Sequence, residues 1–128
     1  MAKKKLSVLI CDDESHIRLM LKTLLKTMNV EITGEAKNGE EAVEIFKEKK
    51  PHITLLDINM PLKTGVEALK EILDIKPNAF VIMMTSVSDM ETVNECITLG
   101  ASNYILKDTP ITEMKEMIKT SWKEYRSG

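Results

Sequence analysis

Two periods of apolar residues alternate along the whole chain, and this alternation constrains the fold more than any other feature. Five short apolar segments have strand character, and each precedes a segment whose apolar residues recur every three or four positions, as on one face of a helix. The five strand segments are residues 6–10, 30–36, 53–56, 80–84 and 102–106. Strand–helix units in strict succession predict an α/β fold, in which helices cover both faces of a five-stranded parallel sheet.

The character of each strand segment predicts its place in the sheet. Segments 6–10, 53–56 and 80–84 are nearly continuous apolar runs, which is typical of central strands buried on both faces. Segment 30–36 alternates and segment 102–106 is mixed, as expected of edge strands. This distribution predicts the doubly wound, flavodoxin-like order 2-1-3-4-5, with the switch point between the first and third strands.

Polar residues at the ends of the helical segments predict how the helices start and stop. Three pairs have the spacing of a capping box, with an acid three residues after the cap: Asn38 and Glu41, Thr64 and Glu67, and Ser88 and Glu91. Gly100 is suited to the C-terminal turn of the fourth helix, and Pro110 to the first turn of the fifth.

Length and composition exclude several classes of function. With 128 residues, we expect residues 1–128 to form a single domain. A net charge of −2 gives no basic field for nucleic acid, and no apolar run is long enough to span a bilayer. The two cysteines, Cys11 and Cys96, make neither a disulfide framework nor a metal cluster, which indicates a reducing cytoplasm.

Five polar residues are predicted at the carboxyl ends of the strands, the edge where open α/β sheets bind ligands. They are Asp12, Asp13, Asp57, Thr85 and Lys107. Two carboxylates about 5 Å apart repel each other by roughly 3 kcal/mol at an effective dielectric near 20, so the fold needs a compensating charge. Oxygen ligands without His or Cys suit a hard dication such as Mg²⁺.

This set of groups is suited to phosphoryl transfer, which needs a nucleophile and positive charge around the phosphoryl oxygens. Asp57 is the natural nucleophile and would form an acyl phosphate. Mg²⁺ and Lys107 would neutralise the phosphoryl group, and the Thr85 hydroxyl would donate a hydrogen bond to one of its oxygens.

Four sequence motifs then resemble the receiver domain of two-component response regulators, most closely the single-domain chemotaxis type. They are Cys11-Asp12-Asp13-Glu14, Leu56-Asp57-Ile58-Asn59-Met60-Pro61 with Gly65, Met84-Thr85-Ser86, and Tyr104-Ile105-Leu106-Lys107. Each motif is weak alone, but all four lie at the end of the proper strand, and the resemblance extends over essentially the whole chain.

The resemblance implies that Asp57 accepts phosphate from a histidine kinase or a phosphotransfer protein. It also implies Mg²⁺ ligation by Asp13, Asp57 and the Asn59 carbonyl, with Asp12 acting through bound water. Such a domain is not an enzyme in the usual sense, although it catalyses its own phosphorylation and dephosphorylation. Tyr104 matches the switch aromatic of the family, which swings inward when the threonine, here Thr85, moves toward the phosphoryl group.

The chain departs from the family pattern after its lysine. The family usually places a proline in a cis peptide directly after this residue, whereas Lys107 precedes Asp108 and the proline comes only at Pro110. Because a cis bond before a non-proline residue costs about 3–4 kcal/mol, we expect a trans or differently wound loop.

Phosphorylation is expected to change a protein-binding surface formed by the fourth helix, the fifth strand and the fifth helix of a monomer. Chemotaxis or motility control, a phosphorelay intermediate, and a receiver separated from a DNA-binding output domain all fit this expectation. A haloacid-dehalogenase-type phosphatase fails on spacing. Its nucleophile lies in an Asp-x-Asp pattern after the first strand, whereas here Asp12 and Asp13 are adjacent and the isolated Asp57 follows the third strand. A flavodoxin-like mononucleotide carrier is disfavoured because Asp12 and Asp13 would repel its phosphate. A degenerate receiver, which is never phosphorylated, is disfavoured because all five residues of an active receiver are present.

Overall fold

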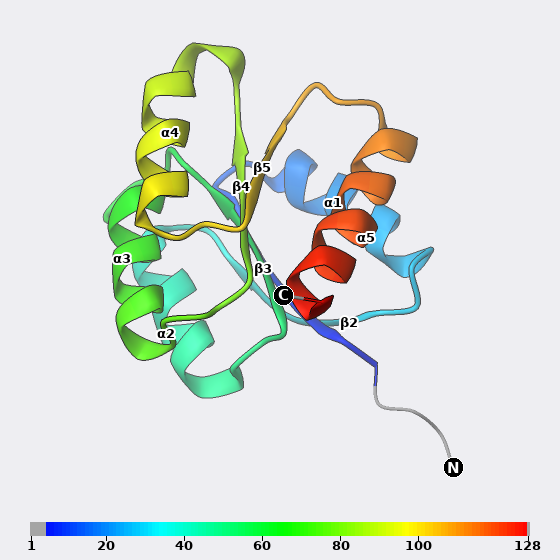
Figure 1. Cartoon of the computed structure of the whole chain (residues 1–128), viewed down its shortest axis with the longest axis horizontal. Coiled ribbons are helices and arrows are strands. Elements are labelled where there is room, and N and C mark those ends of the chain that lie inside the picture. The colour runs from blue at the N-terminus through cyan, green and yellow to red at the C-terminus, as the bar shows by residue number, and fades with distance from the viewer. Residues whose placement is uncertain (1–4, 128) are drawn as a thin grey trace.

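The computed structural model describes residues 5–127, in which strands and helices alternate along the chain (Figure 1). The strands are β1 (Ser7–Cys11), β2 (Glu31–Ala36), β3 (Ile53–Asp57), β4 (Val81–Thr85) and β5 (Asn103–Leu106). The helices are α1 (Ser15–Lys26), α2 (Gly39–Lys49), α3 (Gly65–Ile75), α4 (Met90–Leu99) and α5 (Ile111–Ser127), and a 3₁₀ turn, η1 (Val87–Asp89), precedes α4.

The sheet has the order β2-β1-β3-β4-β5, and its neighbouring strands pair in parallel, which confirms the predicted doubly wound topology. Helices α2, α3 and α4 cover one face of the sheet, and α1 and α5 cover the other (Figure 1). The predicted strand positions are also confirmed: β3 and β4 are buried along their whole length, whereas β2 and β5 at the edges are partly exposed.

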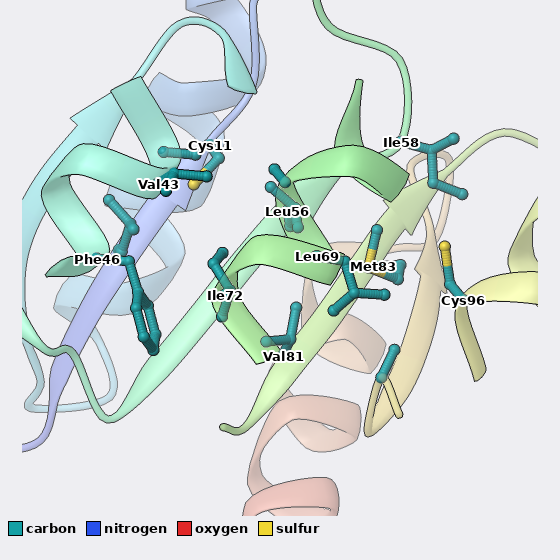
Figure 2. Close-up of a cluster of buried hydrophobic side chains, with 14 of the residues drawn as sticks. Cys11, Val43, Phe46, Leu56, Ile58, Leu69, Ile72, Val81, Met83 and Cys96 are labelled. Atoms are coloured by element: carbon teal, nitrogen blue, oxygen red, sulfur yellow. The ribbon is translucent and has the colours of Figure 1, made fainter. Parts of the chain in front are cut away.

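Each face of the sheet has its own hydrophobic core, because successive side chains of a strand point to opposite faces. In β1, Leu9 and Cys11 join the core beneath α2, α3 and α4, whereas Val8 and Ile10 join the core beneath α1 and α5. Figure 2 shows part of the first core, where Phe46 of α2 and Ile72 of α3 pack toward the strands. The central strands are therefore fixed from both sides, and their carboxyl ends lie on a rigid support.

The capping predictions are confirmed at two helices and wrong at a third. The side chains of Asn38 and Thr64 accept hydrogen bonds that cap α2 and α3, and Thr64 forms a full capping box with Glu67. Ser88 does not open α4, since it lies inside η1 and the N-cap position belongs to Asp89.

The two predicted helix-end residues of the last units lie close to their expected places. Gly100 ends α4 with a φ of 129°, a conformation that residues with a side chain rarely adopt. Pro110 directly precedes α5 instead of lying in its first turn, and its carbonyl accepts the hydrogen bond of the Met114 N–H. Within residues 5–127, no helix has the length and apolar character that crossing a membrane requires.

Candidate functional site at the carboxyl edge of the sheet

The structure brings the predicted residues together where the central strands end. Asp12 directly follows β1, Asp57 and Thr85 are the last residues of β3 and β4, and Lys107 directly follows β5. Backbone hydrogen bonds continue beyond the strands: the Lys107 N–H donates to the Thr85 carbonyl at 2.8 Å. The positions of these side chains are therefore determined by the sheet itself.

Three carboxylates form the acidic part of the site. One oxygen from each of Asp12, Asp13 and Asp57 lies within 4.8 Å of the other two. Asp12 is fully buried and Asp57 is 3% exposed, whereas Asp13 faces solvent. At such distances the carboxylates repel one another, and burial strengthens the repulsion. The oxygen-only donor set fits a hard dication, as the sequence predicted.

Lys107 supplies positive charge to this cluster. Its Nζ lies 3.0 Å from Asp12 Oδ2, 3.2 Å from Asp57 Oδ1 and 3.4 Å from Glu14 Oε1. Burial of the amine opposes its charging, but the contact with Asp12 and the charge of Asp57 outweigh burial and raise the pKa of Lys107. The peptide bonds of the described residues are all trans, so the expected trans loop at Lys107-Asp108 is confirmed and leaves the lysine in the site.

Asp57 holds its proton more tightly than an ordinary aspartate. Burial and the charge of Asp12 raise the pKa of Asp57 to about 7, although Lys107 and the backbone N–H of Asn59 act in the opposite direction. The Asn59 N–H lies 3.3 Å from Asp57 Oδ1. A cation bound beside Asp57 would favour its carboxylate form, and this form is the nucleophile that the sequence predicted.

This pKa predicts how stability depends on pH in the metal-free protein. In the unfolded chain Asp57 ionises near pH 3.8, and in the folded chain near pH 7. Ionisation therefore favours unfolding, and the contribution of Asp57 to stability falls as the pH rises between these values and is constant above them. Asp57→Asn removes the ionisation, so its stability gain over the parent should grow by about 1–3 kcal/mol between pH 5 and 8.

Urea unfolding in the presence of a chelator at each pH measures this difference. The exposed carboxylate of Asp74, in α3, provides the control, and Asp74→Asn should follow the pH dependence of the parent. A difference in the free energy of unfolding between Asp57→Asn and the parent that stayed constant across this pH range would show that the pKa of Asp57 is not raised.

The two predicted switch residues, Thr85 and Tyr104, lie on the neighbouring strands β4 and β5. Thr85 is buried, and its hydroxyl donates to the Ser86 carbonyl at 3.1 Å. The Tyr104 ring is partly buried and packs against the core beneath α4. Tyr104 is paired in register with Met83, which lies two residues before Thr85. The side chains of Thr85 and Tyr104 therefore lie in the same part of the sheet.

A small cavity of about 300 Å³ opens at this edge. Its lining consists of Asp13, Glu14, Asp57, Asn59, Ser86, Asp89 and Lys107. Neither the Glu14 carboxylate nor Asp89 was predicted to take part in the site. Asp89 gave one signal that could have been used, because an aspartate just before the apolar pattern of a helix is a favoured N-cap.

A second groove, of about 520 Å³, lies at the opposite edge of the sheet. Its lining includes Leu6, Val30 and Ile53, which are at the start of β1, β2 and β3, together with Trp122. It is the larger of the two, but the convergent carboxylates and the lysine lie at the carboxyl edge, which we therefore identify as the candidate site.

The fold and the arrangement of Asp57, its two acidic neighbours and Lys107 define a class of signalling domain. Residues 8–119 match the family model described as response regulator receiver domain, and the chain belongs to this family. It is a CheY-like receiver domain of a two-component response regulator, and such domains are signalling switches rather than classical enzymes.

Relatives in several organisms support this assignment. The chain is 45% identical to the chemotaxis protein CheY of Thermotoga maritima over a segment of 100 residues. This segment covers 78% of this chain and 83% of the relative. It is 37% identical over 111 residues to CheY of Bacillus subtilis, covering 87% and 92%. Among solved structures, the CheX-CheY-BeF3-Mg+2 complex from Borrelia burgdorferi matches with a TM-score of 0.85 and 29% identity, covering 90% of this chain and 87% of the other.

Proposed function

We propose that the protein is a phosphorylation-activated switch in which Asp57 accepts a phosphoryl group from a histidine kinase or a phosphotransfer protein. The observation that carries this proposal is the position of the Asp57 carboxylate, 3.2 Å from the Lys107 ammonium and facing an open cavity. The 300 Å³ cavity is large enough for a phosphoryl group. The similarity to chemotaxis proteins favours a pathway that controls motility. The receiver is proposed to act in the cytoplasm as a monomer.

The proposed reaction is a nucleophilic displacement at phosphorus. An oxygen of ionised Asp57 forms a bond to phosphorus while the bond from phosphorus to the donor imidazole nitrogen breaks, and the imidazole takes up a proton. Lys107 pairs with the developing charge on the phosphoryl oxygens. To reset the switch, a water oxygen bonds to the same phosphorus while the bond from phosphorus to the Asp57 oxygen breaks, which releases inorganic phosphate and restores the carboxylate. We propose that the domain catalyses this dephosphorylation itself.

Magnesium is the metal that the site is proposed to bind. Asp13, Asp57 and the Asn59 carbonyl would hold the ion directly, and Asp12 would act through a bound water. When bound, the ion supplies positive charge to the phosphoryl oxygens. The oxygen-only donors within 4.8 Å support this proposal, and the Borrelia burgdorferi relative was solved with Mg²⁺ and BeF₃ in its complex.

We expect Asp13→Ala to weaken Mg²⁺ binding by about tenfold or more, because even loss of a group that only orients a metal ligand costs this much. The metal-free fold should not lose stability, since the substitution also removes one of three repelling carboxylates. Titration calorimetry with Mg²⁺ measures the affinity, and Asp74→Ala provides a control that removes an exposed carboxylate of α3. Unchanged Mg²⁺ affinity in Asp13→Ala would mean that the ion binds elsewhere.

The proposed output of phosphorylation is a changed surface on α4, β5 and α5. Thr85 is buried at the end of β4, and Tyr104 is partly buried on the adjacent strand β5. When the Thr85 hydroxyl turns toward the phosphoryl group, it leaves space into which the Tyr104 ring can move. This gives a two-state element that a local charge change biases, and a downstream target that prefers one state would respond to it.

Thr85→Ala is expected to abolish the phosphorylation-dependent shifts of backbone amides in β5, in α5 and in α4 beyond its first turn, without preventing phosphorylation. Without the hydroxyl, no hydrogen bond to a phosphoryl oxygen forms, and Tyr104 has no new preference. Spectra recorded with and without a small phosphodonor and Mg²⁺ measure the shifts. Thr23→Ala, which removes an exposed threonine of α1, should respond as the parent does. If Thr85→Ala kept the shifts of the parent, the switch would not depend on this hydroxyl.

A further inference from the structure

The carboxylate of Asp89 connects the loop after β3 to the loop after β4. Its Oδ2 accepts one hydrogen bond from the side-chain amide of Asn59 at 2.9 Å and another from the Ser86 hydroxyl at 3.1 Å. The backbone N–H of Asn59 donates to Asp57, and the carbonyl of Ser86 accepts from the Thr85 hydroxyl. One carboxylate thus binds Asn59, two residues after Asp57, and Ser86, the residue after Thr85.

Asp89 also occupies the N-cap position of α4, where its side chain makes no capping hydrogen bond. An aspartate at this position usually accepts a hydrogen bond from the backbone N–H of the second or third helical residue, here Glu91 or Thr92. The positive end of the helix dipole favours a carboxylate at the same place. In this structure the carboxylate is bound to Asn59 and Ser86 instead, so two sets of donors compete for it.

The charge around the cavity determines which set is preferred. Asp89 shares the cavity lining with three other acids and with Lys107. The ion pairs of Lys107 within residues 5–127 go to Asp12, Glu14 and Asp57, whereas the hydrogen bonds of Asp89 come from neutral groups. Phosphorylation consumes the charge of the Asp57 carboxylate and leaves up to about two negative charges on the phosphoryl oxygens, so the cavity gains about one negative charge, which disfavours a carboxylate that faces it.

From these contacts we infer that Asp89 is a positioning residue with two alternative partners. In the unphosphorylated protein the Asp89 carboxylate binds both Asn59 and Ser86. A phosphoryl group on Asp57 repels this carboxylate toward the first turn of α4, which the carboxylate then caps. This inference rests on the proposed phosphorylation of Asp57. It adds a second route from the phosphoryl group to α4, which operates through charge and does not use the Thr85 hydroxyl.

Hydrogen exchange of the Glu91 and Thr92 amides tests the inference, with Mg²⁺ alone and with Mg²⁺ plus beryllofluoride as a stable phosphoryl analogue. In the parent protein, beryllofluoride should slow the exchange of one of these amides about fivefold, which corresponds to the roughly 1 kcal/mol of a typical side-chain cap. Mg²⁺ alone should not slow it, because the ion adds no negative charge. Bound beryllofluoride is detected independently by its ¹⁹F resonances.

Two substitutions of Asp89 separate its charge from its hydrogen bonds. Asp89→Asn keeps an acceptor oxygen but loses the charge, and Asp89→Ala loses both, so neither should show exchange that slows on addition of beryllofluoride. Asp74→Asn, an exposed position in α3, should respond as the parent does.

Three results would overturn the inference: fivefold slowing in Asp89→Ala, fivefold slowing in Asp89→Asn, or no slowing in a parent whose ¹⁹F spectrum shows bound beryllofluoride. The absence of bound ¹⁹F resonances in the parent would instead contradict the proposed phosphorylation, and the inference would fail with it.

Discussion

Gly65→Ala should lower the free energy of unfolding by about 3 kcal/mol or more, the upper range for forcing an extra methyl group into a packed interior. Gly65 is the first residue of α3, and an added Cβ would lie 2.1 Å from the Asp57 carbonyl oxygen and 2.7 Å from the Ile58 Cα. Both are backbone atoms at the end of β3, so they cannot move without displacing the strand end. Alanine is favoured over glycine inside helices by about 1 kcal/mol, which is too little to offset this clash.

The same substitution should also disturb the site, because the strand end that must move carries the Asp57 carboxylate. Chemical denaturation measures the stability, and a lowered capacity for phosphorylation in the folded fraction would report the displaced carboxylate. Gly34→Ala in β2 is the matched control: its Cβ would lie 2.8 Å from Ile45 Cγ2, and its nearest neighbours are all side-chain atoms and not backbone, so the loss should be smaller. Equal losses at Gly34 and Gly65 would show that the contact with β3 has no special importance.

The sequence predicted the sheet because its central strands are apolar on both faces. Residues 53–56 and 80–84 could be assigned to the centre from this pattern alone, and β3 and β4 are indeed buried throughout. The start of α4 was predicted wrongly, since Ser88 and Glu91 have the spacing of a capping box. The chain forms η1 first, and the Asp89 carboxylate accepts hydrogen bonds from the Ser86 hydroxyl and from the Asn59 side chain. The contact with Asn59, 30 positions away, is a tertiary contact that local spacing does not show.

The site residues could be predicted because parallel strands bring their carboxyl ends to one edge. Asp57 and Lys107 are 50 positions apart in the sequence, yet the topology places them at the ends of β3 and β5, the two strands that flank β4. The sequence could not show that Lys107 lies between Asp12 and Asp57, because this depends on the path of the loop after β5. The raised pKa of Asp57 was equally out of reach, since it follows from burial in the folded protein.

The central claim is that Asp57 is the phosphoacceptor. Removal of this carboxylate should therefore reduce phosphorylation more than any other substitution in the chain. Asp12, Asp13 and Glu14 are also carboxylates of the site, but Asp12 is fully buried, and the other two are exposed. Asp57 combines contact with Lys107, a place in the cavity lining and burial at a strand end, whereas Glu14 has the first two features but is exposed. Asp57→Asn is nearly isosteric and keeps the fold, but an amide oxygen is too weak a nucleophile to replace the carboxylate.

The most direct measurement is the intact mass of the protein after incubation with a small phosphodonor and Mg²⁺, recorded for the parent, Asp57→Asn and Asp74→Asn. We expect one added phosphoryl group on the parent and on Asp74→Asn, its loss when Mg²⁺ is chelated beforehand, and no addition to Asp57→Asn. Phosphorylation of Asp57→Asn to the extent of the parent, or no phosphorylation of the parent under any of these conditions, would contradict the account.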